Sequence, residues 1–168
     1  SDVYKRQDWH RAMAFAGRRE FGPAEEMMRR TVDQVTGSAF LLAQTTYWLA
    51  AMVTIRGRLG EADGYWRQSA ELSEENGSNV EALRTLTFAI AADALARGTD
   101  GSPGLDAALA RYPLGAMDPV TRPYLDVASA YAVVGNPAAA RKLVDEFERT
   151  TPANHQRGLR YQYHEVLG

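Results

Sequence analysis

Residues 124–152 read YLDVASAYAVVGNPAAARKLVDEFERTTP, and this stretch decides the fold. Two segments rich in alanine and other helix-forming residues flank the tripeptide Gly135, Asn136 and Pro137. Glycine readily takes the positive φ that ends a helix, asparagine caps the start of the next one, and proline suits a first helical position. The stretch therefore predicts two helices joined by a tight turn, a helical hairpin.

Small residues in this stretch predict where the two helices touch. Ala128 lies seven residues before Gly135, and Ala140 lies five residues after it. Helix axes approach closely only where small side chains face each other, and Tyr131 can fill the wider gap on the next turn. We therefore expect Ala128 and Ala140 to form the contact of the hairpin.

The same spacing recurs along the chain. The expected turn residues lie 33 to 41 residues apart and are Arg19, Gly57, Gly98, Gly135 and Gly168. Seven residues before them lie Ala12, Ala50, Ala91, Ala128 and Tyr161. Five residues after the first four lie Ala24, Ala62, Pro103 and Ala140. The third turn is longer, so Ala107 is expected to replace Pro103 as the contact residue.

Turn signals place the other expected helices without leaving room for a strand. The expected helices cover about residues 8–19, 23–36, 39–57, 61–76, 80–98, 102–111, 123–134, 137–151 and 153–167. Pro23 is expected at a first helical position, and Ser38 is expected to cap the third helix. The longest irregular segment is YPLGAMDPVTRP, residues 112–123.

These features resemble tetratricopeptide repeats. The signature positions are occupied in the opening stretch by Tyr124, Val127, Ala128, Tyr131, Gly135, Ala140 and Pro152. The segment GRLGEA, residues 57–62, is similar to the turn of repeats in bacterial signalling proteins. The resemblance implies an all-α fold, an α-solenoid of antiparallel helical hairpins with about four and a half repeats. The expected domain covers residues 8–168, with repeats at 8–37, 38–77, 78–113 and 118–152 and a partial repeat at 153–168.

The two ends of the sequence suggest a piece of a longer protein. The first seven residues, SDVYKRQ, resemble a translated sequencing adapter, so we expect residues 1–7 to be a non-native segment. The last expected helix has no following helix to pack against. The chain also resembles the C-terminal repeat region of large bacterial Ser/Thr kinases and transcriptional regulators, although it has no kinase motif.

Composition narrows the class of protein. The 168 residues contain 19 Lys and Arg against 21 Asp and Glu, a net charge of −2, which gives no indication of nucleic-acid binding. The absence of cysteine excludes disulfides and thiolate chemistry and fits a reducing compartment, so we expect a cytoplasmic protein. No apolar run approaches the length of a membrane-spanning helix.

The sequence offers no convergent chemistry. The histidines, His10, His155 and His164, do not have the spacing of a metal site. Adjacent acidic pairs such as Glu25 and Glu26 diverge by about 100° on a helix, so they are expected on a solvated face, paired with arginines four residues later. We expect no catalytic residue, no metal, no cofactor and no enzymatic activity.

The repeat resemblance implies a binding groove. In that family, the second, fifth, ninth and twelfth residues of each first helix line the concave face. Here those positions hold few charges and lack the Lys, Arg and Asn set that clamps a peptide carboxylate. The expected partner-binding residues are Gln44, Tyr47, Thr54, Thr85, Phe88, Leu95, Arg122, Leu125 and Ser129, with Ala51, Ala92 and Ala132 between them. The groove would hold a helix or extended segment of another protein, or another part of the parent chain.

Two functions remain open at this stage. The first is a non-catalytic scaffold for protein–protein interaction, with a protein or peptide as its partner and neither nucleic acid nor membrane. The alternative is a regulatory or ligand-sensing repeat domain of a bacterial signalling kinase or transcriptional regulator. A helical enzyme is a third class, for which the sequence supplies no candidate residue.

Overall fold

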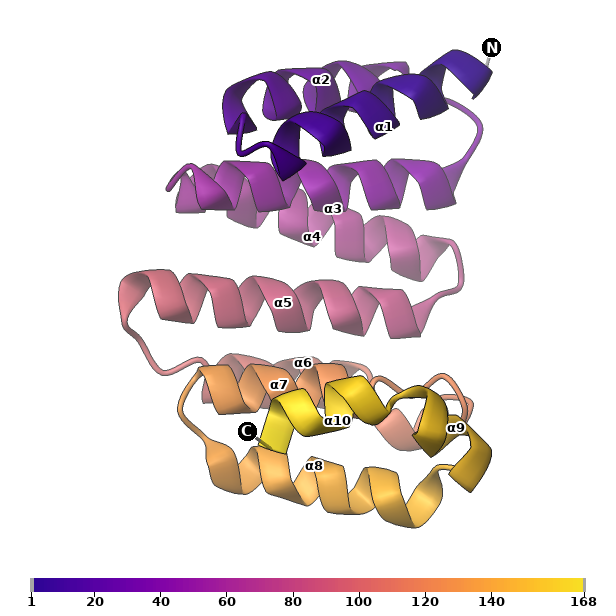
Figure 1. Ribbon diagram of the computed structural model, residues 1–168, viewed down its shortest axis with the longest axis vertical. Helices are drawn as coiled ribbons and strands as arrows, with labels where there is room; N and C mark the ends of the chain where they lie inside the picture. Colours follow the sequence, from indigo (N-terminus) through magenta and orange to yellow (C-terminus); the bar gives the residue numbers. More distant parts are fainter. Residues whose placement is uncertain (1, 168) are drawn as a thin grey trace. The chain divides into compact units, whose positions relative to one another are not determined.

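The computed structural model describes the backbone of residues 2–167 and the side chains of residues 7–159, 161, 162, 164 and 166. Over these residues the chain is helical, with no strand (Figure 1). The fold class predicted from the sequence, all-α, is therefore confirmed. The chain divides into two compact units, Ser1–Ser78 and Asn79–Gly168.

The first unit contains four helices in which each packs on the next. They are α1 (Asp2–Gly17), α2 (Phe21–Gln34), α3 (Ala39–Ile55) and α4 (Leu59–Glu75). The contacts run from α1 to α2, from α2 to α3 and from α3 to α4. The core of this unit contains the predicted contact alanines Ala12, Ala24, Ala50 and Ala62, each at most 1% exposed. Larger side chains, including Met28, Leu49 and Trp66, fill the rest.

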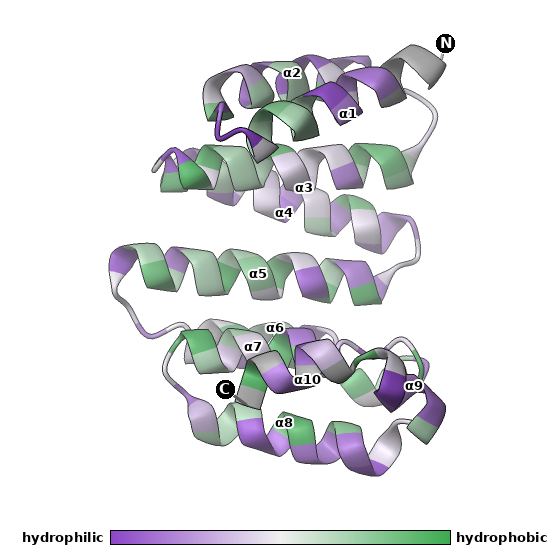
Figure 2. Cartoon of the chain, in the orientation of Figure 1, coloured by the Kyte–Doolittle hydropathy of each residue, from purple (hydrophilic) through white to green (hydrophobic). Residues whose placement is uncertain are grey.

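The second unit is built around the opening stretch of the sequence. Its helices are α5 (Asn79–Arg97), α6 (Ser102–Arg111), the 3-10 helix η1 (Leu114–Ala116), α7 (Tyr124–Val133), α8 (Pro137–Thr150), α9 (Ala153–Gly158) and α10 (Arg160–Leu167). Helix α7 contacts α5, α6, α8 and α10. Hydrophilic and hydrophobic residues alternate along α8 (Figure 2), and its hydrophobic residues Leu143, Val144 and Phe147 are buried. Ala128 and Ala140 are buried as well.

The turns between helices follow the predicted chemistry. Gly57, Gly98 and Gly135 have positive φ, and so does Arg19, which occupies the equivalent place in the first turn. The side chain of Ser38 accepts a hydrogen bond from the Leu41 amide at 3.2 Å. That of Asn136 accepts one from the Ala139 amide at 3.1 Å. Both predicted caps are confirmed, because they depend only on residues three apart.

Most helix boundaries lie within two residues of the predicted ones; α4, for example, begins at Leu59 rather than at residue 61. Helix α1 begins at Asp2 and so includes most of residues 1–7. Pro23 is the third residue of α2 rather than the first, which costs nothing because none of the first four amides has a partner within its helix. The last expected helix is divided at Leu159 into α9 and α10, directly after Gly158, a residue of low helix propensity.

The third turn corrects the predicted contact residue. Ala107 is exposed, whereas Leu105 and Ala108 are buried. The close approach occurs at Gly101, where an added Cβ would lie 2.7 Å from Val134 Cγ1 and 2.9 Å from Ala94 Cβ. A glycine, smaller than the predicted alanine, therefore makes this contact.

Candidate functional site

The predicted groove residues are shared between the two units. Gln44, Tyr47 and Thr54 lie on α3 in the first unit. Thr85, Phe88 and Leu95 lie on α5 in the second. Arg122 precedes α7, and Leu125 and Ser129 lie on it.

The set on α3 is tied to the packing of Trp66. The Tyr47 ring meets the Trp66 ring edge-on, with centroids 5.0 Å apart. Trp66 Nε1 donates a hydrogen bond to Thr54 Oγ1 at 3.1 Å, and Thr54 Oγ1 donates to the Ala50 carbonyl at 2.8 Å. Gln44 is exposed. Two of these three side chains thus position a buried tryptophan.

The set on α5 presents an apolar surface. Phe88 is 47% exposed and Leu95 is 71% exposed, whereas Thr85 is buried. Residues seven apart on a helix point in nearly the same direction, so Phe88 and Leu95 lie on one face, with half-buried Ala92 between them. We call Phe88, Ala92 and Leu95 the α5 stripe.

The set around α7 is engaged inside the second unit. Leu125 is only 4% exposed, and Ser129 is half-buried. Arg122 Nε donates to the Met117 carbonyl at 3.0 Å, and its Nη2 donates to the Gly115 carbonyl at 3.3 Å. The guanidinium therefore stabilises the irregular segment that precedes α7.

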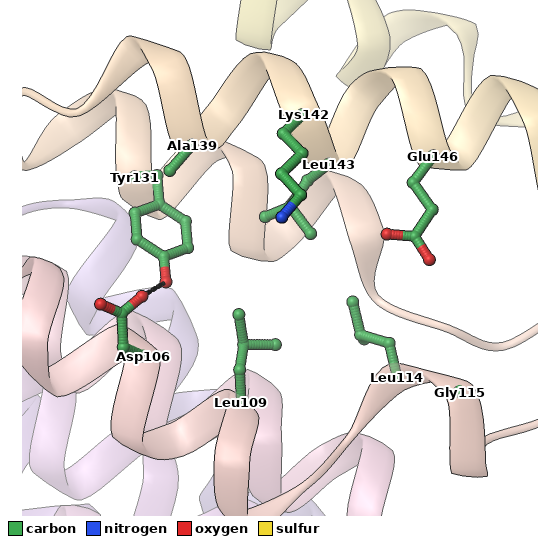
Figure 3. A pocket seen from close by; sticks show the side chains of 9 residues that line it. All are labelled: Asp106, Leu109, Leu114, Gly115, Tyr131, Ala139, Lys142, Leu143 and Glu146. Carbon is green, nitrogen blue, oxygen red and sulfur yellow. Dashed lines mark hydrogen bonds between the residues drawn. The ribbon is translucent and has the colours of Figure 1, made fainter.

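A cavity lined by described side chains was not predicted from the sequence. It lies within the second unit, has a volume of about 360 Å³, and is open to solvent (Figure 3). Four elements contribute to it: α6, η1, α7 and α8. Its lining residues are Asp106, Leu109, Leu114, Gly115, Tyr131, Ala139, Lys142, Leu143 and Glu146. No local motif marks it, because these elements lie up to 40 residues apart in the sequence.

The cavity combines an apolar wall with polar groups at its rim. Leu109, Leu114 and Leu143 form the apolar part. The hydroxyl of Tyr131 donates a hydrogen bond to Asp106 Oδ1 (Figure 3). Burial and the neighbouring Asp106 carboxylate raise the pKa of Tyr131, so the phenol stays protonated and remains the donor.

Two further charged side chains of the rim come from successive turns of α8. Glu146 Oε1 accepts a hydrogen bond from the Tyr124 hydroxyl at 3.2 Å and lies 4.0 Å from Arg149. The amine of Lys142 points into the cavity (Figure 3). Within the described part of the chain, Lys142 has neither a hydrogen bond nor an ion pair. The rim therefore has an exposed cationic group that forms no ion pair with any described side chain.

A second charged cluster holds the first unit together. The Glu25 side chain is 5% exposed, and its oxygens lie 2.7 Å from Arg29 Nη2 and 2.7 Å from Arg56 Nη1. Arg58 contacts the same carboxylate. Burial alone raises the pKa of Glu25, but the hydrogen bonds from these arginines outweigh it and lower that pKa to about 2. The prediction of a solvated Glu25 is wrong, because the turn between α3 and α4 covers it with Arg56 and Arg58.

The described residues contain no group of three or more side chains suited to holding a metal ion. The three histidines lie on three different helices, His10 on α1, His155 on α9 and His164 on α10. Over the same residues, no helix combines the length and apolar character needed to cross a bilayer.

Comparison of the chain with protein-family models, with curated proteins and with solved structures finds no match.

Proposed function

We propose that this chain is a tetratricopeptide-like repeat protein of the bacterial cytoplasm that binds a segment of another protein without catalysing a reaction. The recurring spacing of its turns and buried alanines supports antiparallel hairpins stacked as a solenoid. The observation that carries the binding proposal is the α5 stripe, on which Phe88 and Leu95 are 47% and 71% exposed.

An amphipathic helix is the partner that such a stripe fits. Apolar residues at positions i, i+4 and i+7 of α5 match the apolar face of a second helix, which has the same spacing. Full burial of one large apolar side chain is worth about 1.5–3 kcal/mol, so two such side chains dominate a small interface. The stripe carries no charge, which favours an apolar partner surface over an acidic or basic one.

The proposal is tested with helical peptides selected for binding to the immobilised full chain. Their affinities are then measured by fluorescence anisotropy for the wild type and for the double variant Phe88→Ala/Leu95→Ala. We expect the double variant to lower affinity at least about tenfold, since each truncation of a central apolar residue typically costs more than 1 kcal/mol.

Phe40→Ala is the matched control. Phe40 is an equally large apolar side chain, 58% exposed, on α3. It lies outside the α5 stripe, so its truncation should leave affinity unchanged. Equal affinities for the wild type and the double variant would exclude the α5 stripe as the binding surface.

The cavity of the second unit favours a second function, regulation by a small ligand. A volume of about 360 Å³ lies within the range of small-molecule sites. Its mixture of apolar wall and few polar groups is also typical of such sites. In this function the chain would be a sensing domain of a bacterial signalling kinase or transcriptional regulator.

A further inference from the structure

The charges around the cavity restrict what it can bind. Lys142 directs its ammonium into the cavity, where no described side chain pairs with it, and Glu146 and Asp106 place carboxylates at the rim (Figure 3). Leu109, Leu114 and Leu143 line the apolar part of the cavity. A complementary ligand therefore needs an anionic group, a cationic group and an apolar body.

Ligands with a single charge match the cavity less well. A simple carboxylic acid would pair with Lys142 but would bring a second negative charge towards Glu146 and Asp106. A simple amine would pair with an acid and leave the Lys142 ammonium facing a like charge. Like charges in contact oppose binding, so a ligand carrying both groups is favoured over either.

The two acids have different roles. Asp106 already accepts the hydrogen bond of Tyr131, which closes one end of the cavity. Glu146 lies one helical turn beyond Lys142 on α8, and the two side chains do not pair with each other. A carboxylate oxygen can accept more than one hydrogen bond, so Glu146 retains capacity for a donor although Tyr124 already contacts it.

We propose that the cavity binds a free α-amino acid with an apolar side chain. Lys142 pairs with the ligand carboxylate, Glu146 accepts from its ammonium group, and the apolar side chain lies against Leu109, Leu114 and Leu143. This inference rests on the second function proposed above, regulation by a small ligand, and it is independent of the α5 stripe.

The binding test observes Lys142 by NMR, which is practical because the sequence contains few lysines. Lys5 and Lys142 are the two lysines of the sequence. Reductive methylation with ¹³C-formaldehyde keeps the positive charge and gives each lysine a separate NMR signal, which Lys142→Met assigns. The full methylated chain is titrated with L-leucine, with 4-methylpentanoate, which lacks the amine, with 3-methylbutylamine, which lacks the carboxylate, and with glycine, which lacks the apolar body.

L-Leucine should shift the Lys142 signal in a saturable manner, and its affinity should exceed that of each analogue by about tenfold, the effect of losing one matched charge or the apolar contact. Binding measured by calorimetry should fall about tenfold in Lys142→Met, which keeps the alkyl stem, and also in Glu146→Gln. In Lys142→Met, leucine should lose its advantage over 3-methylbutylamine. Arg141→Met is the matched control, because Arg141 is exposed on α8 and pairs with Asp145 away from the cavity lining.

Two results would overturn the inference. One leaves the second proposed function standing, and the other excludes it as well. If 4-methylpentanoate or 3-methylbutylamine binds as well as leucine, the amino-acid assignment is wrong, but regulation by a small ligand stands. If no compound in the panel moves the Lys142 signal, the cavity is not a site for such ligands, and the second function falls with it.

Discussion

The carboxylate of Glu25 shows how one residue can organise a unit. It is buried where α2 meets the turn between α3 and α4, and it is held by Arg29, Arg56 and Arg58. Arg29 also donates to the Tyr65 hydroxyl at 2.6 Å, which extends the cluster onto α4. A buried charge with several hydrogen-bonding partners is stabilising only while it stays ionised.

The stability of the first unit should therefore fall in acid. The pKa of Glu25 is about 2 in the folded chain against an ordinary 4.5, so its contribution is fully present above pH 5 and is lost as pH falls towards 2. Solvent screens the arginines, which are 33–44% exposed, so we expect a contribution of about 1–3 kcal/mol. Urea unfolding at pH 7 and pH 3 measures it.

Glu25→Gln should be less stable than the wild type at pH 7, and the difference should shrink at pH 3. Glu26→Gln is the control, because Glu26 is the exposed neighbour and should not change the pH dependence. A difference between the wild type and Glu25→Gln that stays constant from pH 7 to pH 3 would contradict this role of the carboxylate.

Arg19 is the second informative residue. It has φ of 60° at the turn position that glycine occupies in the later hairpins. The left-handed conformation costs a residue with a Cβ about 1–2 kcal/mol, whereas glycine takes it freely but loses more chain entropy on folding. We expect Arg19→Gly to raise the free energy of unfolding by about 0.5–1 kcal/mol.

Chemical denaturation of Arg18→Gly provides the comparison. Arg18 is the preceding residue of the same turn and has no positive φ, so glycine there should lower stability by about 0.5–1 kcal/mol. If Arg19→Gly and Arg18→Gly lower the free energy of unfolding equally, the positive φ of Arg19 does not determine the effect of its substitution.

At the scale of helices, close packing depends on single small residues. Gly101 is the N-cap residue directly before α6 and has φ of −86°, a conformation that alanine also takes. The space around it is closed by Val134 and Ala94. Glycine is therefore required here for its lack of a side chain and not for its backbone freedom.

Gly101→Ala should destabilise the chain by about 1–3 kcal/mol, the usual cost of overpacking. Gly64→Ala is the matched control, because Gly64 lies inside α4 and an added Cβ there would have nothing within 4 Å apart from its chain neighbours and the backbone of its own helix. It should gain about 0.5–1 kcal/mol from the higher helix propensity of alanine. Thermal unfolding measures the stability of both variants. If Gly101→Ala stabilises the chain, the residues around Gly101 can move apart without loss of stability.

At the scale of the whole molecule, each of the two units has its own core. Ala50, Val53 and Trp66 are buried in the first, and Val127, Ala128 and Val144 are buried in the second. Proteins open locally in cooperative units that often coincide with such motifs.

Amide hydrogen exchange of the full chain should distinguish the units. Glu25→Gln should speed exchange in α2, α3 and α4 and leave α7 and α8 unchanged. Gly101→Ala should speed exchange in α7 and α8 and leave α2, α3 and α4 unchanged. Faster exchange throughout the chain in both variants would indicate one cooperative domain, as the sequence predicts for residues 8–168.

Much of the fold could be predicted from local chemistry. The helical class, the caps at Ser38 and Asn136, and the turns at Gly57 and Gly135 are set by residues within four positions of one another. The burial of Ala12, Ala50 and Ala128 could be predicted because their spacing repeats. The prediction failed at Ala107, because the extended third turn shifts the close approach to Gly101.

The candidate site could be predicted only in part. The resemblance to tetratricopeptide repeats assigned Phe88 and Leu95 to the groove, and both side chains are exposed. Thr85 and Leu125 were assigned in the same way but are buried, since spacing does not tell which neighbours cover a helix face. The cavity had no sequence signal at all.

The sequence by itself determined where helices begin, turn and end, because hydrogen bonds within a helix and its caps join residues only a few positions apart. Tertiary structure alone decided which distant side chains meet. Arg56 reaches Glu25 across 31 residues, and Tyr131 reaches Asp106 across 25. The cavity that Lys142 lines likewise exists only because α6, η1, α7 and α8 pack together, and a local sequence pattern does not determine which distant helices pack.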